Sequence, residues 1–247
     1  MIKFFRQIRR DLMEKNNTGK YLKYAIGEIV LVMIGILLAL QVNNWNEMNK
    51  KKRLKNEYQT SLTNDYTKDT LQLNDRLKRN KKRLALLTSV IDSIDNGFYT
   101  TIEDYIELYL NNFSSISVIN IYNSNSFNLL ISTGNIDLFD KKFRTELMEL
   151  NRLQRAEQIV QNGNKDYLFK FMQNVSLKYP SPNIGNPFHA DAAIQLLWKN
   201  VRIDDLPRDL LSLISQERYT IIRYIELTES VLHQTELVLK LLNNSNT

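Results

Sequence analysis

The most distinct feature of the hydropathy pattern is an uninterrupted apolar run near the start of the chain. Residues 29–40 carry no polar side chain, and a few more residues on either side extend the run to 19, interrupted only by Glu28 and Gln41. At about 1.5 Å per residue, a helix of this length is about 28 Å long, close to the thickness of a bilayer's hydrocarbon core. The run predicts one transmembrane helix, and we place this anchor at residues 21–44.

The flanks of the run are typical of a membrane span. Aromatic and basic side chains are expected at the two interfaces, and the residues that meet this description are Tyr21, Lys23, Tyr24 and Trp45. A cleaved signal peptide is disfavoured because the run is long and no small-x-small cleavage site follows it. A buried helix of a soluble protein is the remaining, less favoured alternative, because such helices lack these flanks.

Small residues within the run define one face of the expected helix. Glu28, Gly35 and Ala39 are seven and four residues apart, so they share that face. A small-xxx-small pair allows two helices to approach closely. The spacing predicts self-association, with Glu28 paired to Lys23 or to a partner; a chance placement of two small residues stays open as the alternative.

Beyond the run, the pattern changes to that of long amphipathic helices. From Leu73 to Phe98 the inward positions alternate at four and three residues, with Asn80 as the one polar member. No Gly or Pro lies between residues 42 and 96, so the helix is expected to continue from the span and to end near Gly97.

Two further long helices are expected. The first begins at Asp137 or Asp140 and runs to about residue 179, with an apolar stripe that includes Tyr167, and Gly163 is a candidate point for a bend or break. The second starts near residue 205, and its 4–3 seam runs from Leu211 through Arg218 to residue 242.

Shorter elements connect these helices. Thr100 and Glu103 have the spacing of a capping box for a helix over 101–112, and Gly134 ends a short helix over 124–133. Partial alternation favours an extended segment at 113–122. A proline-rich loop is expected at 179–188, followed by a helix over about 188–200.

Together these patterns predict an all-α fold with a single N-terminal transmembrane helix followed by an antiparallel helical bundle of long heptad-patterned helices. The expected organisation is a basic amphipathic segment at 1–20, the anchor at 21–44 and a helical extramembrane domain at 45–247.

Charge is concentrated at the start of the chain. The net charge is +6, but residues 1–55 carry 12 Lys and Arg against 4 Asp and Glu, whereas the rest carries 21 against 23. Without a basic stripe on the larger part, nucleic acid is not an expected partner. The basic, amphipathic start is instead typical of a helix lying on an anionic membrane face; a frayed tail is the alternative.

Composition excludes most catalytic chemistry. There is no Cys and there are only two His, so thiolate sites, cysteine nucleophiles and multi-histidine metal sites are excluded. His189 and Asp191 stand two residues apart and do not share a helix face, and His233 falls on a polar face. With 7 Gly there is no phosphate loop. We expect no enzyme activity, no cofactor and no metal.

Three stretches resemble a known bacterial membrane family. They are the start at 1–10, the run from Tyr24 to Glu47, and the stretch from Phe127 to Phe139, where Thr133 replaces the usual Ser and Ile136 the usual Leu. The family they resemble is the one called domain of unknown function 6090. The resemblance covers the first 50 residues closely and the rest loosely. It implies a single-pass protein with a helical extracytoplasmic domain, and it implies no reaction.

These observations predict a membrane-anchored helical interaction or scaffold module. The expected partners are the lipid bilayer, an unidentified protein and a second copy of the chain, joined through the transmembrane helix or the heptad seams. The alternative is an extracytoplasmic ligand-sensing bundle that works with a partner membrane protein. The excess of basic residues before the span weakly favours a cytoplasmic N-terminus in a bacterial inner membrane, with the C-terminal domain periplasmic.

Overall fold

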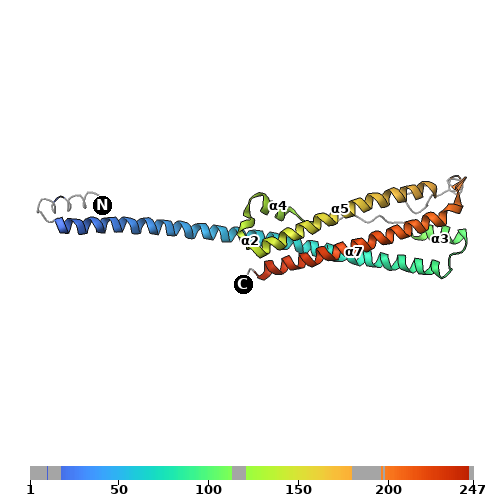
Figure 1. Ribbon diagram of the computed structural model, residues 1–247, viewed down its shortest axis with the longest axis horizontal. Coiled ribbons are helices and arrows are strands. Elements are labelled where there is room, and N and C mark those ends of the chain that lie inside the picture. The colour runs from blue at the N-terminus through green and yellow to red at the C-terminus, as the bar shows by residue number, and fades with distance from the viewer. Residues whose placement is uncertain (1–9, 11–17, 113–120, 180–195, 197, 245–247) are drawn as a thin grey trace. The chain divides into compact units, whose positions relative to one another are not determined.

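The computed structural model describes residues 10, 18–112, 121–179, 196 and 198–244, and all regular structure within them is helical. The main elements are α2 (Thr18–Asp95), α3 (Ile102–Asn112), α4 (Asn125–Ser132), the 3-10 turn η1 (Asn135–Leu138), α5 (Lys141–Lys178), the 3-10 turn η2 (Ile203–Asp205) and α7 (Leu206–Asn244) (Figure 1). The predicted all-α class is confirmed. Outside the described residues lie most of the segment expected to be extended at 113–122, the proline-rich loop and most of the helix expected at 188–200.

The chain divides into two compact units, residues 1–57 and 58–247. Helix α2 contributes residues to both, and it continues from the apolar run to Asp95 as predicted. It ends beside Gly97, whose φ of 76° lies in the left-handed region that glycine adopts without strain. Phe98, expected as the last seam residue, is instead 75% exposed, because the chain has already left the helix there.

The start of α3 corrects the predicted capping box by one residue. The Asp104 carboxylate accepts hydrogen bonds from the backbone N–H groups of Thr100 and Thr101, and the Thr101 hydroxyl accepts one from the Asp104 N–H. These reciprocal bonds hold the pKa of Asp104 below its usual value. The box is therefore Thr101 with Asp104, and the Asp104 carboxylate takes the place that a glutamate usually fills.

The connection between α4 and α5 follows the predicted pattern. Gly134 adopts a left-handed φ of 69° after α4. Of the two candidate caps for α5, the structure selects Asp140, whose Oδ1 accepts a hydrogen bond from the Phe143 N–H at 2.9 Å. The helix then continues through Gly163 without a break.

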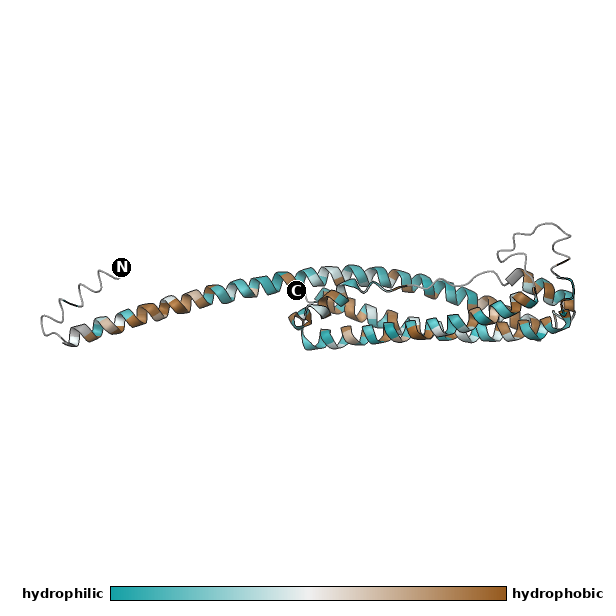
Figure 2. Ribbon diagram, turned by 90° about the horizontal axis from the view of Figure 1, so that it is seen from above, coloured by the Kyte–Doolittle hydropathy of each residue, from teal (hydrophilic) through white to brown (hydrophobic). Residues whose placement is uncertain are grey.

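Within residues 58–247, the long helices form a bundle (Figures 1 and 2). Helix α7 runs antiparallel to both α2 and α5, whereas α2 and α5 run in the same direction. Ion pairs between α2 and α7 illustrate the antiparallel order, with Lys81 on Glu229 and Arg83 on Glu217. The short helices α3 and α4 lie at opposite ends of the bundle.

The apolar core has two parts. One, which we call the α3-end cluster, gathers residues from four helices; it comprises Leu87, Leu108, Tyr109, Val175, Tyr179, Leu206, Leu210, Leu213, Ile214 and Ile221. The other is a group of buried residues toward the α4 end, which includes Leu62, Tyr66, Phe127, Leu130, Phe143, Leu147, Val238 and Leu242. In both parts, the long helices supply most of the buried side chains and one short helix, α3 or α4, adds two more.

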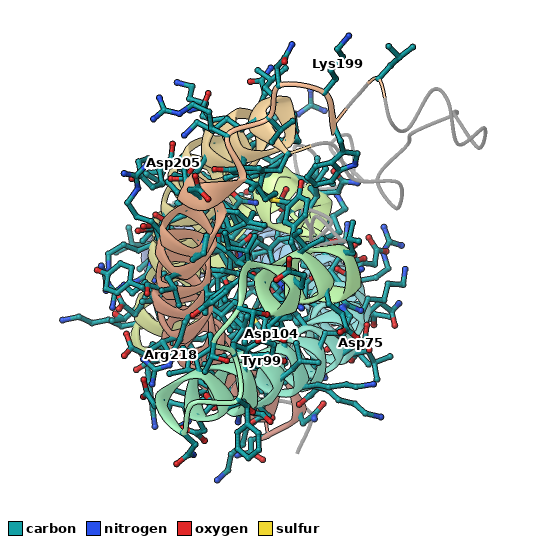
Figure 3. All side chains as sticks on the ribbon, turned by 90° about the vertical axis from the view of Figure 1, so that its right-hand side faces the viewer. Asp75, Tyr99, Asp104, Lys199, Asp205 and Arg218 are labelled. Atoms are coloured by element: carbon teal, nitrogen blue, oxygen red, sulfur yellow. The ribbon has the colours of Figure 1, made fainter. Side chains whose placement is uncertain are left out.

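Besides Phe98, three seam positions were predicted wrongly. Leu211 and Arg218 on α7 and Tyr167 on α5 are exposed, and Figure 3 shows Arg218 on the outside of the bundle with Asp75 and Lys199. A helix packed against two neighbours buries a stripe wider than a single a/d seam. On α7 this stripe is centred one residue away from the predicted seam, so Leu210, Leu213 and Thr220 are buried instead.

Candidate functional site

The apolar run of α2 presents a fully exposed hydrophobic surface. Its large apolar side chains, from Leu22 to Val42, are about half exposed or more, and the most apolar 18-residue window is not buried at all. Figure 2 shows this part of α2 as a continuous hydrophobic band. By length and composition, α2 is long and apolar enough to cross a membrane. A core helix of a soluble protein would be mostly buried, which this part of α2 is not.

The predicted interface residues lie at the two ends of this band. Tyr24 and Trp45 are 61% and 65% exposed, and Lys23 is exposed beside Tyr24. The side chain of Tyr21 lies outside the described set. At 1.5 Å per residue, Tyr24 and Trp45 are about 32 Å apart along the helix, which matches two aromatic anchors at opposite edges of a hydrocarbon core.

The predicted association face is sterically open. Gly35 and Ala39 are exposed, and a Cβ placed on Gly35 would meet no atom within 4 Å. Glu28 lies on the same face and is half-buried. None of the described residues occupies the face at Gly35, so the helix has room there for a close neighbour.

A second feature, of which the sequence patterns singled out only Asn80, is a polar section in the middle of the bundle core. We call it the buried polar layer, and it comprises Asp69, Arg76 and Asn80 of α2, Gln154, Glu157 and Gln161 of α5, and Thr228 of α7. On each helix these positions fall between the two apolar parts of the core. These residues are spaced three, four or seven apart on their helices, as core residues are. A search for apolar stripes passes over them because their side chains are polar.

Glu157 is the centre of this layer. It is 0% exposed and accepts hydrogen bonds from Arg76 Nη1 at 2.9 Å and Thr228 Oγ1 at 2.7 Å, and from the Tyr122 hydroxyl. Arg76 also stacks its guanidinium 5.7 Å from the centre of the Tyr122 ring. The carboxylate therefore joins α2, α5, α7 and the segment before α4, and charge-assisted bonds of this kind are the strong ones.

Asp69, two helical turns before Arg76 on α2, binds the same segment before α4. Its Oδ1 accepts hydrogen bonds from the backbone N–H and the side-chain amide of Asn123, at 3.0 and 2.7 Å. Burial raises the pKa of Asp69 above its usual value, although the bonds from Asn123 oppose the rise. Burial beside Asp69 also raises the pKa of Tyr66.

The layer is incompletely satisfied by the protein. Arg76 Nε, Asp69 Oδ2 and Gln154 Nε2 are buried and find no hydrogen-bond partner within the described residues. Gln59 Nε2 and Thr220 Oγ1 are in the same situation elsewhere in the core. Unpaired buried polar groups are uncommon in folded proteins, because each carries a desolvation cost of about 1–3 kcal/mol.

The candidate residues for chemistry gain no support. His233 is exposed on α7, and His189 and Asp191 lie outside the described residues. Among the residues that the structure describes, no three His, Asp or Glu side chains are grouped to hold a metal ion.

Substitution of Glu157 tests the importance of the polar layer for stability. Glu157→Gln leaves the buried Arg76 guanidinium without a counter-charge, and breaking such a pair costs about 3–5 kcal/mol. The free energy of unfolding of the full-length chain in detergent, followed by circular dichroism in denaturant, measures this loss. The matched control is Glu149→Gln, which removes a solvent-exposed pair with Arg152 and should lower the free energy of unfolding far less. Equal effects of the two substitutions would contradict the analysis.

Replacement of Asp69 tests the pKa shift. Because the folded protein holds the Asp69 proton more tightly than the unfolded chain, ionisation disfavours folding, and stability falls as pH rises from about 3.8 through the raised pKa. Asp69→Asn lacks this ionisation but keeps an acceptor for Asn123. The variant's stability relative to the wild type should therefore increase with pH across this window. Asp75→Asn, at an exposed position on α2, serves as the control for charge removal; the same pH trend in both variants would refute the assignment.

Comparison with known proteins places the chain in a family without assigning a reaction. The model of the family of unknown function DUF6090 matches residues 28–176, which is more than half of the chain. No curated protein and no solved structure matches it. The matched region contains most of the apolar run, the polar-layer residues of α2 and α5, and Tyr122. The chain is therefore a member of this family of unknown function.

Proposed function

We propose that this protein is a membrane-anchored helical scaffold, held in a bilayer by the apolar run of α2 and offering the bundle of residues 58–247 to a protein partner. The observation that carries the proposal is the exposed hydrophobic band from Leu22 to Val42. Left in water, a band of this size would aggregate, and in a bilayer it needs no other cover. The proposal includes no catalytic step.

The surface of the bundle supports a docking role. Six large apolar side chains among its described residues are more than two-thirds exposed; they are Leu71, Phe98, Ile121, Ile159, Leu177 and Leu196. The heptad seams of α2, α5 and α7 pack against one another within the chain. For contacts between copies, this favours the open face of the transmembrane run over the seams.

The alternative function is ligand sensing together with a partner membrane protein. Its supporting observation is the polar interior, where Arg76, Asp69 and Gln154 keep unpaired buried groups that a polar ligand would satisfy. In either case we place the N-terminus in the cytoplasm of a bacterial cell and the bundle in the periplasm, following the basic excess before the span.

Membrane extraction and reporter fusions test the anchor and its orientation. We expect the full-length chain to stay in the membrane pellet at alkaline pH, because an integral helix is not released by disrupting ionic contacts. A periplasm-active reporter fused after Thr247 should be active, and a cytoplasm-active one inactive. Release into the soluble fraction would overturn the anchor, whereas the opposite reporter pattern would reverse the orientation only.

Substitution of the small residues tests self-association. Gly35→Ile with Ala39→Ile places two branched side chains on the open face, which prevents close helix approach without crowding the chain itself. We expect cross-linking between copies in membranes to fall several-fold. Gly27→Ile is the matched control, since its position is equally open but lies on another face of the helix. Unchanged cross-linking of the double variant would refute this interface.

A further inference from the structure

A dense group of cations follows the apolar run on α2. Five of six consecutive residues are basic, and they form what we call the basic collar: Lys50, Lys51, Lys52, Arg53 and Lys55. Only two carboxylates lie within three residues of the collar, Glu47 and Glu57, so this stretch of helix keeps a clear positive excess.

Four of the collar's five side chains, those of Lys50 to Arg53, are exposed and stay available to an external anion. Lys50 pairs with Glu47 at 3.3 Å and Arg53 with Glu57 at 3.7 Å, but all four side chains are more than half exposed. Exposed pairs of this kind contribute at most about 1 kcal/mol, so an external anion competes with them readily. Lys51 and Lys52 are exposed and form no ion pair with the described residues.

The arrangement of these cations matches a planar layer of negative charge. With 100° between successive residues, the five side chains point in all directions around α2, while they rise by only about 8 Å along its axis. A protein that follows a nucleic-acid backbone needs basic side chains along one face over a long stretch. A ring at nearly constant height instead fits a surface that the helix crosses, which is the geometry of a bilayer.

The distance of the collar from the apolar run also fits the dimensions of a bilayer. Lys50 is eight residues beyond Val42, which is about 12 Å along the helix. The headgroup layer of one leaflet is about 5–8 Å thick. The collar therefore begins just outside the headgroups, within the screening length of about 8 Å at physiological salt, and long lysine and arginine side chains reach back toward them.

We propose that the basic collar binds anionic phospholipid headgroups and enriches them around the membrane exit of α2. This inference rests on the proposed membrane anchor and adds the class of lipid that the protein selects. Each basic residue near an anionic surface gains attraction, and the ring geometry lets the exposed collar residues act on lipids of the same leaflet.

Trp45 provides a direct test, because it lies between the apolar run and the collar and is exposed. The chain has only one other tryptophan, Trp198, which Trp198→Phe removes. The full-length variant is reconstituted into phosphatidylcholine vesicles that contain a small, equal fraction of either brominated phosphatidylglycerol or brominated phosphatidylcholine. Bromine quenches nearby tryptophan, so the ratio of the two quenching levels reports the local enrichment of the anionic lipid.

We expect quenching by the anionic lipid to exceed that by phosphatidylcholine by on the order of twofold, and the excess to shrink with added salt. Changing all five collar residues to Gln should bring the ratio to one. The matched control neutralises another basic run of α2, Lys78, Arg79, Lys81 and Lys82, which lies more than 35 residues beyond Val42 and should leave the ratio unchanged.

The failures are distinguishable. Strong but equal quenching by both lipids in the protein with an intact collar would overturn the collar and leave the anchor standing. A ratio above one that persists after all five collar residues are changed to Gln would also overturn the collar and leave the anchor standing. Absence of quenching by either lipid would show that Trp45 does not sit at a bilayer, which would overturn the anchor and the collar together.

Discussion

The structure of the bundle depends on the cost of keeping the Glu157 carboxylate away from water. An ion in the protein interior is tolerated only when donors replace its lost hydration. Glu157 obtains them from Arg76, Tyr122 and Thr228, which lie 81, 35 and 71 residues away along the chain. No two helices can meet this requirement alone. The carboxylate thus fixes the register of all three long helices at one level and holds the segment before α4 against them.

The two units arrange their apolar side chains in opposite ways, and one rule accounts for both. In residues 58–247, most of the buried side chains are apolar, and the few charges among them are paired with other charges or with hydrogen-bond donors. In the apolar run of α2, hydrophobic side chains are outside and the backbone is satisfied within the helix, which is the condition for a lipid environment. The change from exposed to buried apolar side chains along α2 falls near Trp45 and the basic collar.

Sequence periodicity predicted much of this structure and missed its interior chemistry. The extent of α2, the Asp140 cap, the left-handed Gly134 and the start of α7 followed from local signals, because caps and breaks depend on neighbouring residues. The exposure of Leu211 and Arg218 did not, since it depends on how many partners α7 has. The roles of Asp69, Arg76 and Glu157 were also hidden, because a charged residue at a heptad position has the same sequence signature whether its partner is water or another helix.

The pairing of Arg76 with Glu157 has a consequence for how the sequence can change over evolutionary time. Losing either charge leaves the other buried without its partner, which destabilises the fold. Exchanging both for apolar side chains of similar volume often leaves the stability unchanged or increases it. Intermediate sequences with one charge are thus the disfavoured ones. Related chains should carry both residues or neither, so that two positions far apart in the sequence vary as a single unit and record the contact between α2 and α5 in the sequences themselves.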